Sequence, residues 1–371
     1  MNLPVDTAPA ADHAIGRRSL LKTAMTIGGA AAAAPFAAVS PVIAADQGAP
    51  GTLNLPARAI PVPRTVSLEA QQFLVAAAAR PAGAGEPTFK DNVAWKAHIA
   101  SVNRIFDPII DRMLAGPAKV ERTTIGGVSV CIGTPNVMRH PGRARLTIHG
   151  GGWSLLGGRY VMGDAAQTAA ESGCITYSVD YRMLPDFPFP AGVDDCVAVY
   201  REIIKRHDPK KVAISGESAG GNIAGAATLK IRDSGLPLPG AVGLMTPAAD
   251  LFALGDTHQT NWGVDVVLRW SPGVPNASVE AYAGGHDLKD PYLSPLFGDF
   301  TKGFPPTYLQ SGTRDLLLSD TVRMHRKLLA AGIEAELHVW EAMPHAGFGG
   351  TAPEDVEARR QFLKFVDKHL S

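Results

Sequence analysis

A serine between two closely spaced glycines is the clearest chemical signal in this chain. The sequence GESAG at 216–220 follows an apolar run at 212–214 that predicts a short buried strand, and a helical pattern begins at Asn222. A serine at the apex of so tight a turn has strained backbone, so its flanking residues must lack side chains. The pattern G-x-S-x-G between a strand and a helix is typical of a nucleophile elbow. We therefore predict that Ser218 is a nucleophile.

A serine hydroxyl needs a base to take its proton and an acid to orient that base. His345 lies in a loop framed by proline and glycine after the last predicted strand, and Asp315 follows the strand before it. The carboxyl ends of strands are where sites form in open α/β sheets. Asp250 and Asp320 are rival acids, although we expect Asp320 to belong to a helix N-cap. The predicted triad is Ser218, Asp315 and His345, in the chain order that this architecture requires.

A loop of three glycines could stabilise the negative charge that forms during attack on a carbonyl. His149 and Gly150–Gly152 follow a predicted core strand, in the H-G-G-G pattern of an oxyanion loop. Backbone amides serve this purpose best when no side chain crowds them. We expect the donors to be the amides of Gly151, Gly152 and Ala219, with His149 and Gly150 supporting the loop.

Several motifs of the chain, including those described above, together resemble the motifs of a known protein family. They are HGGGW at 149–153, GESAGG at 216–221, DYRMLP at 180–185 with FPA at 189–191, DPYLSP at 290–295, and the pair Asp315 and His345. Together they resemble the bacterial hormone-sensitive-lipase family of α/β-hydrolase carboxylesterases, from roughly residue 145 to the C-terminus. The resemblance implies the same triad and oxyanion amides, and a cap over the acyl or alcohol pocket formed by helices at 66–115. Glu217 departs from the Asp or Thr that is more usual in this family.

This resemblance implies a serine carboxylesterase that hydrolyses small to medium carboxylic esters through an acyl-enzyme on Ser218. A lactone hydrolase with the same triad is an alternative, because a lactone is a cyclic ester. A non-catalytic ligand-binding homologue is a more distant one, since it would be expected to lack a triad member. Candidates to line the pocket are Trp95, Trp153, Leu155 and Phe187, although each is equally explained as a core residue.

The elements that must position these residues alternate along the chain from residue 118. Strands are predicted at 120–125 and 128–132 around a Gly-Gly turn, and short apolar runs predict further strands at 144–148, 174–179, 212–214, 241–245, 307–310 and 336–340. Helical patterns lie between or after them, at 161–172, 193–206, 222–232, 320–331 and 353–370. Fully apolar strands that alternate with helices predict a mostly parallel sheet covered on both faces, here an α/β-hydrolase fold over 118–371. The first two strands form a hairpin with a Gly-Gly turn, and 251–304 is expected to hold one short helix.

Two amphipathic helical patterns precede this domain. The first spans 68–79 and stops at a proline, and the second spans 91–114, with apolar residues three and four positions apart. We assign 65–117 as an N-terminal helical cap segment and 46–64, which is rich in Pro, Gly and Ala, as an irregular lead-in.

The first 45 residues are predicted to be an export signal. Arg17 and Arg18 precede a charge-free stretch at 23–45 that is rich in alanine and glycine, as in a twin-arginine signal. Small residues before Asp46 suit cleavage, so we expect a periplasmic or secreted protein without stable membrane association. The alternative is an uncleaved anchor, because the stretch is about long enough to span a bilayer.

The composition of the chain indicates which classes of partner and cofactor to expect. The 35 basic and 35 acidic residues balance without a basic stripe, which argues against nucleic acid or an anionic membrane surface as a partner. The expected partner is the small-molecule ester or lactone that the motifs and the family resemblance imply. Cys131, Cys174 and Cys196 are widely spaced, so we expect buried, reduced thiols, with one disulfide as the alternative for an exported protein. The chain has no H-E-x-x-H and no nucleotide fingerprint, so the sequence predicts neither a metal nor a cofactor.

Overall fold

The computed structural model describes residues 52–53, 55–80, 91–269 and 276–370. Two compact units divide the chain, 1–58 and 59–371. The described residues of the first unit are exposed and have no helix or strand, and the predicted signal at 1–45 lies outside the described residues. In the described ranges, no helix is both long and apolar enough to cross a membrane.

Eight strands of the second unit form one sheet in the described part of the chain, in the order β1-β2-β4-β3-β5-β6-β7-β8. Their bounds are β1 Ala118–Ile125, β2 Val128–Pro135, β3 Ala144–Ile148, β4 Ile175–Asp180, β5 Val212–Glu217, β6 Ala241–Met245, β7 Thr307–Gly312 and β8 Ala335–Trp340. β2 pairs antiparallel with both β1 and β4, and the other pairs are parallel. Every residue of β3 is buried, as a strand covered on both faces requires. The predicted mostly parallel α/β-hydrolase sheet is confirmed.

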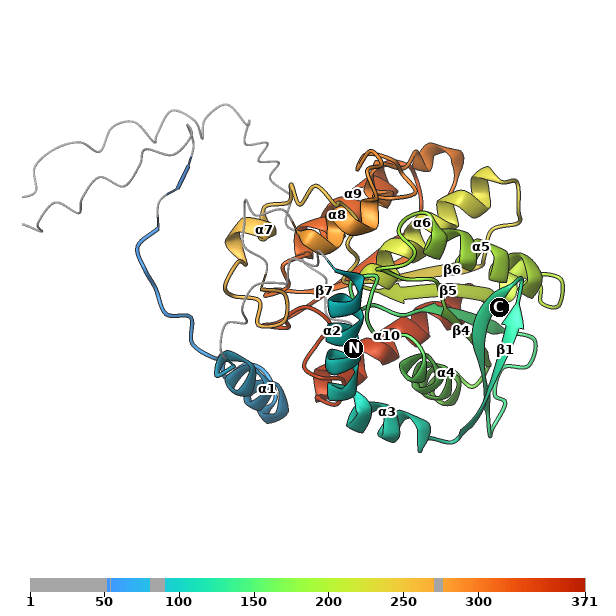
Figure 1. Cartoon of the computed structure of the whole chain (residues 1–371), viewed down its shortest axis with the longest axis horizontal. Coiled ribbons are helices and arrows are strands. Elements are labelled where there is room, and N and C mark those ends of the chain that lie inside the picture. The colour runs from blue at the N-terminus through green and yellow to red at the C-terminus, as the bar shows by residue number, and fades with distance from the viewer. Residues whose placement is uncertain (1–51, 54, 81–90, 270–275, 371) are drawn as a thin grey trace, which may run out of the picture. The chain divides into compact units, whose positions relative to one another are not determined.

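Helices cover both faces of this sheet. Their bounds are α1 Leu68–Ala78, α2 Asn92–Ile105, α3 Asp107–Leu114, α4 Arg159–Ser172, α5 Ala191–Ile203, α6 Ala219–Asp233, α7 Thr257–Thr260, α8 Ala277–Ala283, α9 Leu318–Ala330 and α10 Pro353–His369. Figure 1 shows α4 and α10 on one side of the sheet and α5 and α6 on the other. The main hydrophobic core lies on the side of the sheet that carries α5 and α6, whereas α4 and α10 contribute to two smaller clusters on the other side.

Two of our expectations about helices are wrong. The pattern at 91–114 is divided at Phe106 into α2 and α3, because Pro108 has no N–H to continue the helical hydrogen bonds. The irregular region 251–304 holds more than one short helix, namely α7, α8 and two 3-10 helices at Pro295–Phe297 and Phe300–Lys302.

The N-terminal helices pack on different parts of the domain. α1 buries Ala70 and Leu74 against the loop after β8, where Met343 and Phe348 are also buried, and Val66 just before the helix joins this cluster. α3 packs against α4. α1 therefore supports the segment that carries His345, whereas α2 and α3 lie beside the start of the catalytic domain.

Candidate active site

Ser218 lies at a sharp turn between β5 and α6. Its φ of 57° is in the left-handed region, which costs free energy in any residue except glycine. A Cβ on Gly216 would lie 2.1 Å from the carbonyl oxygen of Gly220, and a Cβ on Gly220 would lie 2.1 Å from that of Ile148. Both flanking glycines are therefore required by contact with backbone, as the elbow motif predicted.

The structure brings Ser218, His345 and Asp315 together in one line. Ser218 Oγ lies 2.8 Å from His345 Nε2, and His345 Nδ1 lies 3.0 Å from Asp315 Oδ1. Asp315 also accepts hydrogen bonds from Ser311 Oγ at 2.6 Å and from the Leu317 amide at 2.9 Å. In this arrangement Nδ1–H donates to the carboxylate, which leaves the Nε2 lone pair facing the serine hydroxyl.

The charges around His345 favour its protonated form. Burial alone lowers the pKa of His345, but the charge of Asp315 and its hydrogen bond outweigh burial, so the pKa is raised. Asp265 adds to this effect, and sequence reasoning missed it. Its carboxylate is buried and accepts hydrogen bonds from the amides of Leu316, Val267 and Leu268. Asp265 lies in an irregular stretch, where no periodic pattern or motif marked it.

The two rival acids have other partners. Asp320 accepts a hydrogen bond from the Asp250 amide and lies 3.1 Å from His258 Nε2. Asp250 is paired with Arg323. The expectation that Asp320 belongs to a helix N-cap is wrong, because α9 begins at Leu318 and Asp320 is fully buried within its first turn.

The glycine loop passes directly beside the nucleophile. A Cβ on Gly150 would lie 2.9 Å from the carbonyl oxygen of Glu217. Gly151 and Gly152 have φ values of 102° and 58°, which glycine adopts without strain. Within the described ranges, the amides of Gly151, Gly152 and Ala219 donate no hydrogen bond. Three uncommitted donors therefore lie in the loop and at the start of α6, where we expect the oxyanion.

His149 has the supporting role expected of it. Its Nδ1 donates to the carbonyl oxygen of Gly150 at 2.8 Å, and its ring stacks on Tyr181 with centroids 4.4 Å apart. The Tyr181 hydroxyl donates back to the His149 carbonyl at 3.0 Å. Burial lowers the pKa of His149, so the ring is neutral and braces the turn.

A cavity of about 870 Å³ opens onto Ser218 and His345. Of the four candidate pocket residues, Trp95, Trp153 and Leu155 line it. The assignment of Phe187 is wrong, because its side chain is 44% exposed outside the cavity and lies under the guanidinium of Arg182. The loop around Phe187 turns its ring outward, and an apolar residue near a motif gave no information about that direction.

Asn222 is a structural residue of the site that the sequence did not single out. Its side-chain amide donates to the carbonyl oxygens of Ala248 and Leu293, both at 2.8 Å, and its Oδ1 accepts from Trp153 Nε1 at 3.3 Å. Trp153 also stacks on Tyr282, with centroids 4.4 Å apart. Asn222 thus ties the first turn of α6 to the oxyanion loop, and Trp153 both packs and lines the cavity.

Glu217, the unusual residue of the elbow, lies in the same cavity. Burial raises the pKa of Glu217 to about 7, although the neighbouring positive charge of His345 opposes this. Its carboxyl makes no hydrogen bond or ion pair to a described residue. An acid that ionises near neutral pH therefore lies next to the nucleophile.

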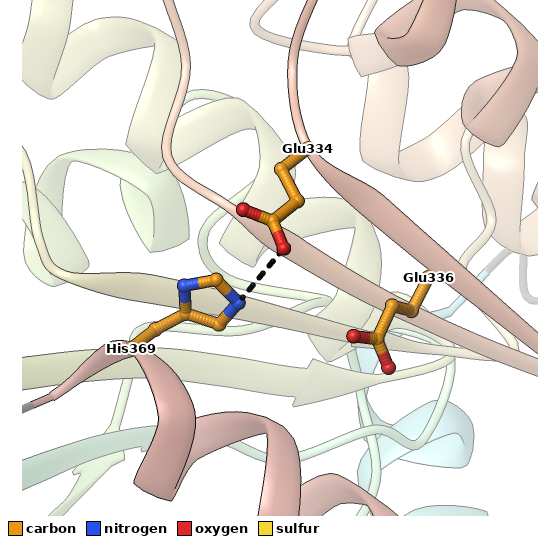
Figure 2. Close-up of side chains that lie close together, drawn as sticks. All are labelled: Glu334, Glu336 and His369. Atoms are coloured by element: carbon orange, nitrogen blue, oxygen red, sulfur yellow. Dashed lines mark ion pairs between the residues drawn. The ribbon is translucent and has the colours of Figure 1, made fainter.

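One cluster in the described ranges has the ligand types of a metal site. Ligand atoms of Glu334, Glu336 and His369 lie within 4.8 Å of one another, where β8 begins and α10 ends (Figure 2). Lys368 Nζ bonds to Glu334 at 2.6 Å and to Glu336 at 3.1 Å. The lysine already supplies a positive charge to both carboxylates, so the cluster is explained as an ion-pair network that joins α10 to β8.

Comparisons with known proteins agree with this geometry. Residues 145–348 match the family model described as alpha/beta hydrolase fold. An acetyl-hydrolase of Streptomyces hygroscopicus is 35% identical over 214 residues, which cover 56% of this chain and 69% of that protein. Carboxylesterase NlhH of Mycobacterium tuberculosis is 31% identical over 274 residues, which cover 68% of this chain and 83% of that protein.

Solved structures give the same result. The crystal structure of esterase E25 matches with a TM-score of 0.76 and 34% identity, over 86% of this chain and 99% of that one. An esterase from the bacterial hormone-sensitive lipase family matches with a TM-score of 0.69 and 30% identity, over 82% of this chain and 99% of that one. As its motifs predicted, this chain belongs to the α/β-hydrolase fold family, among the ester hydrolases of the bacterial hormone-sensitive-lipase type.

Proposed function

We propose that this protein is a serine carboxylesterase that hydrolyses small to medium carboxylic esters through an acyl-enzyme on Ser218. The observation that carries the proposal is the line of hydrogen bonds from Ser218 Oγ through His345 to Asp315. Ser218 and His345 line a cavity that is large enough for such an ester. The names of the relatives, among them acetyl-hydrolase and carboxylesterase, support this substrate class.

The first half-reaction acylates the enzyme. Ser218 Oγ attacks the ester carbonyl carbon while His345 Nε2 takes the hydroxyl proton. The carbonyl π electrons move to oxygen, and the amides of Gly151, Gly152 and Ala219 hold that oxyanion. When the intermediate collapses, the bond to the leaving oxygen breaks and His345 returns the proton to it, which releases the alcohol.

The second half-reaction repeats these steps with water. His345 takes a proton from water as its oxygen attacks the acyl carbon, and then returns a proton to Ser218 Oγ as that bond breaks. The products are the free acid and the original enzyme. Asp315 orients the ring of His345 and stabilises the imidazolium that forms twice per turnover.

Steady-state hydrolysis of p-nitrophenyl acetate and butyrate by the full chain tests this proposal. We expect Ser218→Ala to lower kcat by about 10⁶-fold, to the background rate of the assay. Thr228→Ala, further along α6, is the matched control, because Thr228 only bonds to the backbone of its own helix. Equal rates for Ser218→Ala and wild type would exclude the acyl-enzyme.

We also propose that the protein is exported and acts in the periplasm or outside the cell. The pair Arg17 and Arg18 before a charge-free stretch supports this proposal. Replacing both arginines by lysine should retain the protein in the cytoplasm, as measured by cell fractionation. Normal export of this variant would contradict a twin-arginine route.

A further inference from the structure

The cavity continues well past the catalytic residues. It runs along one face of the sheet between α4 and α10, the two helices on that side in Figure 1. Tyr160 in the first turn of α4 and Glu171 in its last turn both line it, so its length is roughly 16 Å. The part far from Ser218, here called the inner lobe, is lined by Arg145, Thr147, Gln167, Glu171, Ser215, Arg359 and Phe362.

Arg145 is the unusual residue of the inner lobe. It is the second residue of β3, in the middle of the sheet, and its side chain is only 5% exposed. Its Nη2 donates to Ser215 Oγ at 2.9 Å, and its guanidinium carbon lies 4.7 Å from the ring centroid of Phe362. Its Nε makes no hydrogen bond. Among the described residues no carboxylate forms an ion pair with this arginine.

The nearest acids are already committed to other partners. Asp164 accepts hydrogen bonds from the hydroxyls of Thr147 and Ser178. Glu171 accepts from Arg359 Nε at 2.9 Å and from Gln167 at 3.0 Å. The charges of Asp164 and Glu171 favour the charged guanidinium from a distance, while its burial opposes it.

A buried charge without a direct partner is costly, and a guanidinium does not lose its proton in a protein. Its Nε and Nη2 form a fork that fits the two oxygens of a carboxylate, and Nη2 has a second N–H besides the one that it donates to Ser215. The guanidinium carbon lies over the ring of Phe362, and Nε is buried with no acceptor among the described residues. The donors of Arg145 in the inner lobe therefore suit a planar anion with two oxygens, such as a carboxylate.

We propose that Arg145 binds a second carboxylate carried by the substrate, so that the preferred esters are monoesters of dicarboxylic acids. This inference rests on the proposed function of Ser218. The ester carbonyl lies at Ser218, the acyl chain follows the cavity between α4 and α10, and its free carboxylate reaches Arg145. The acid released on hydrolysis is then a free dicarboxylic acid.

The register of the sheet sets the length of this acid. Ser215, which holds the guanidinium, is three residues before Ser218 along β5. At the rise of a strand, this separation is roughly 10 Å, a distance that an acyl chain of about six to eight carbons spans. Shorter diacids would not bring both groups into place.

The test compares charged and neutral esters of equal length. The substrates are p-nitrophenyl monoesters of succinic, adipic, suberic and sebacic acid, each beside the p-nitrophenyl alkanoate of the same carbon number. We expect wild type to favour the adipate or suberate ester by about tenfold to a hundredfold in kcat/KM, mainly through KM. Arg145→Gln should lose that preference and keep its rate on neutral esters. Arg143→Gln, which removes an arginine outside the cavity, should retain the preference.

A second measurement needs no variant. Free adipate or suberate should inhibit the hydrolysis of the neutral ester competitively, and at about tenfold lower concentration than hexanoate or octanoate. A wild type that prefers neutral esters, or an unchanged preference in Arg145→Gln, would overturn the inference and give Arg145 a purely structural role. If wild type does not hydrolyse neutral esters or the charged monoesters, the proposed function itself would be overturned.

Discussion

Ser311 Oγ donates a hydrogen bond of 2.6 Å to Asp315 Oδ2, while Asp315 Oδ1 faces His345 Nδ1 at 3.0 Å. Ser311 and Asp315 are both fully buried. The hydroxyl holds the plane of the carboxylate that orients the imidazole. Ser311 lies within β7, where its type alone gave no sign of this contact.

Replacing Ser311 by alanine should lower kcat by about tenfold, because a hydrogen bond to a charged group contributes about 1.5 kcal/mol or more. KM should change little, since Ser311 does not line the cavity. Thr307→Ala removes a buried hydroxyl from the other end of β7, where it bonds to the Pro305 carbonyl, and should leave kcat unchanged. Equal kcat values for the two variants would contradict the positioning role.

The choice of Asp315 over its rivals gives a second prediction. Asp315→Asn should lower kcat by about 10⁴-fold, because an amide no longer holds the required tautomer of His345 or stabilises its cation. Asp250→Asn should lower the melting temperature, as it weakens the pair with Arg323, and should leave kcat of the folded enzyme near wild type. Kinetics at saturating ester with parallel thermal unfolding separate the two. A larger loss of kcat in Asp250→Asn would reverse the assignment.

Glu217 should make stability depend on pH. Its pKa is about 7 in the folded protein against 4.5 as its ordinary value, so between these values the folded state holds a proton that the unfolded state has lost. Stability from this group therefore falls as the pH rises from about 4.5 to about 7. Glutamine does not ionise, so Glu217→Gln should gain in melting temperature relative to wild type across this window and keep a constant advantage above it.

The matched control for that experiment is Glu121→Gln, which removes an exposed acid from β1. Thermal unfolding of the three proteins between pH 4.5 and pH 8 is the measurement. A difference between Glu217→Gln and wild type that stays constant with pH would show that folding does not raise the pKa of Glu217, which would contradict this prediction.

The elbow makes a steric prediction. Gly220→Ala should destabilise the fold by about 1–3 kcal/mol or more and abolish activity, because its Cβ would lie 2.1 Å from the Ile148 carbonyl oxygen. Gly127→Ala at the β1–β2 hairpin is the control. Gly127 has a positive φ, of 84°, which Gly220 lacks, but no atom lies within 4 Å of the added Cβ, so this variant adds backbone strain without a steric contact. Chemical denaturation measures the free energy of unfolding of both variants. A loss in Gly220→Ala no larger than that in Gly127→Ala would contradict a steric contact as the reason that Gly220 is necessary.

Local sequence predicted the elements that position the site. The bounds of β3 and β6 match the strands predicted at 144–148 and 241–245. The division between α2 and α3 was missed, since the apolar period continues through Phe106 while only the missing N–H of Pro108 interrupts the helix.

Contacts between distant segments were beyond sequence reasoning. Asp265 lies about fifty residues before the Leu316 amide that it binds, in a stretch without periodicity. Phe187 faces outward because its loop is fixed by tertiary contacts, such as the bond from the Phe189 amide to the Tyr282 carbonyl. Arg145 occupies a core strand, where its residue type conflicts with its burial, and its contacts with Ser215 and Phe362 come from segments far away in the sequence.

Intact-protein mass spectrometry after exposure to a fluorophosphonate ester tests directly whether Ser218 is the nucleophile. We expect one covalent adduct on wild type, located at Ser218 by peptide mapping, and none on Ser218→Ala. His345→Ala should react far more slowly, because the hydroxyl loses the base that lies 2.8 Å away. An adduct on another residue, or equal labelling of Ser218→Ala, would contradict Ser218 as the nucleophile.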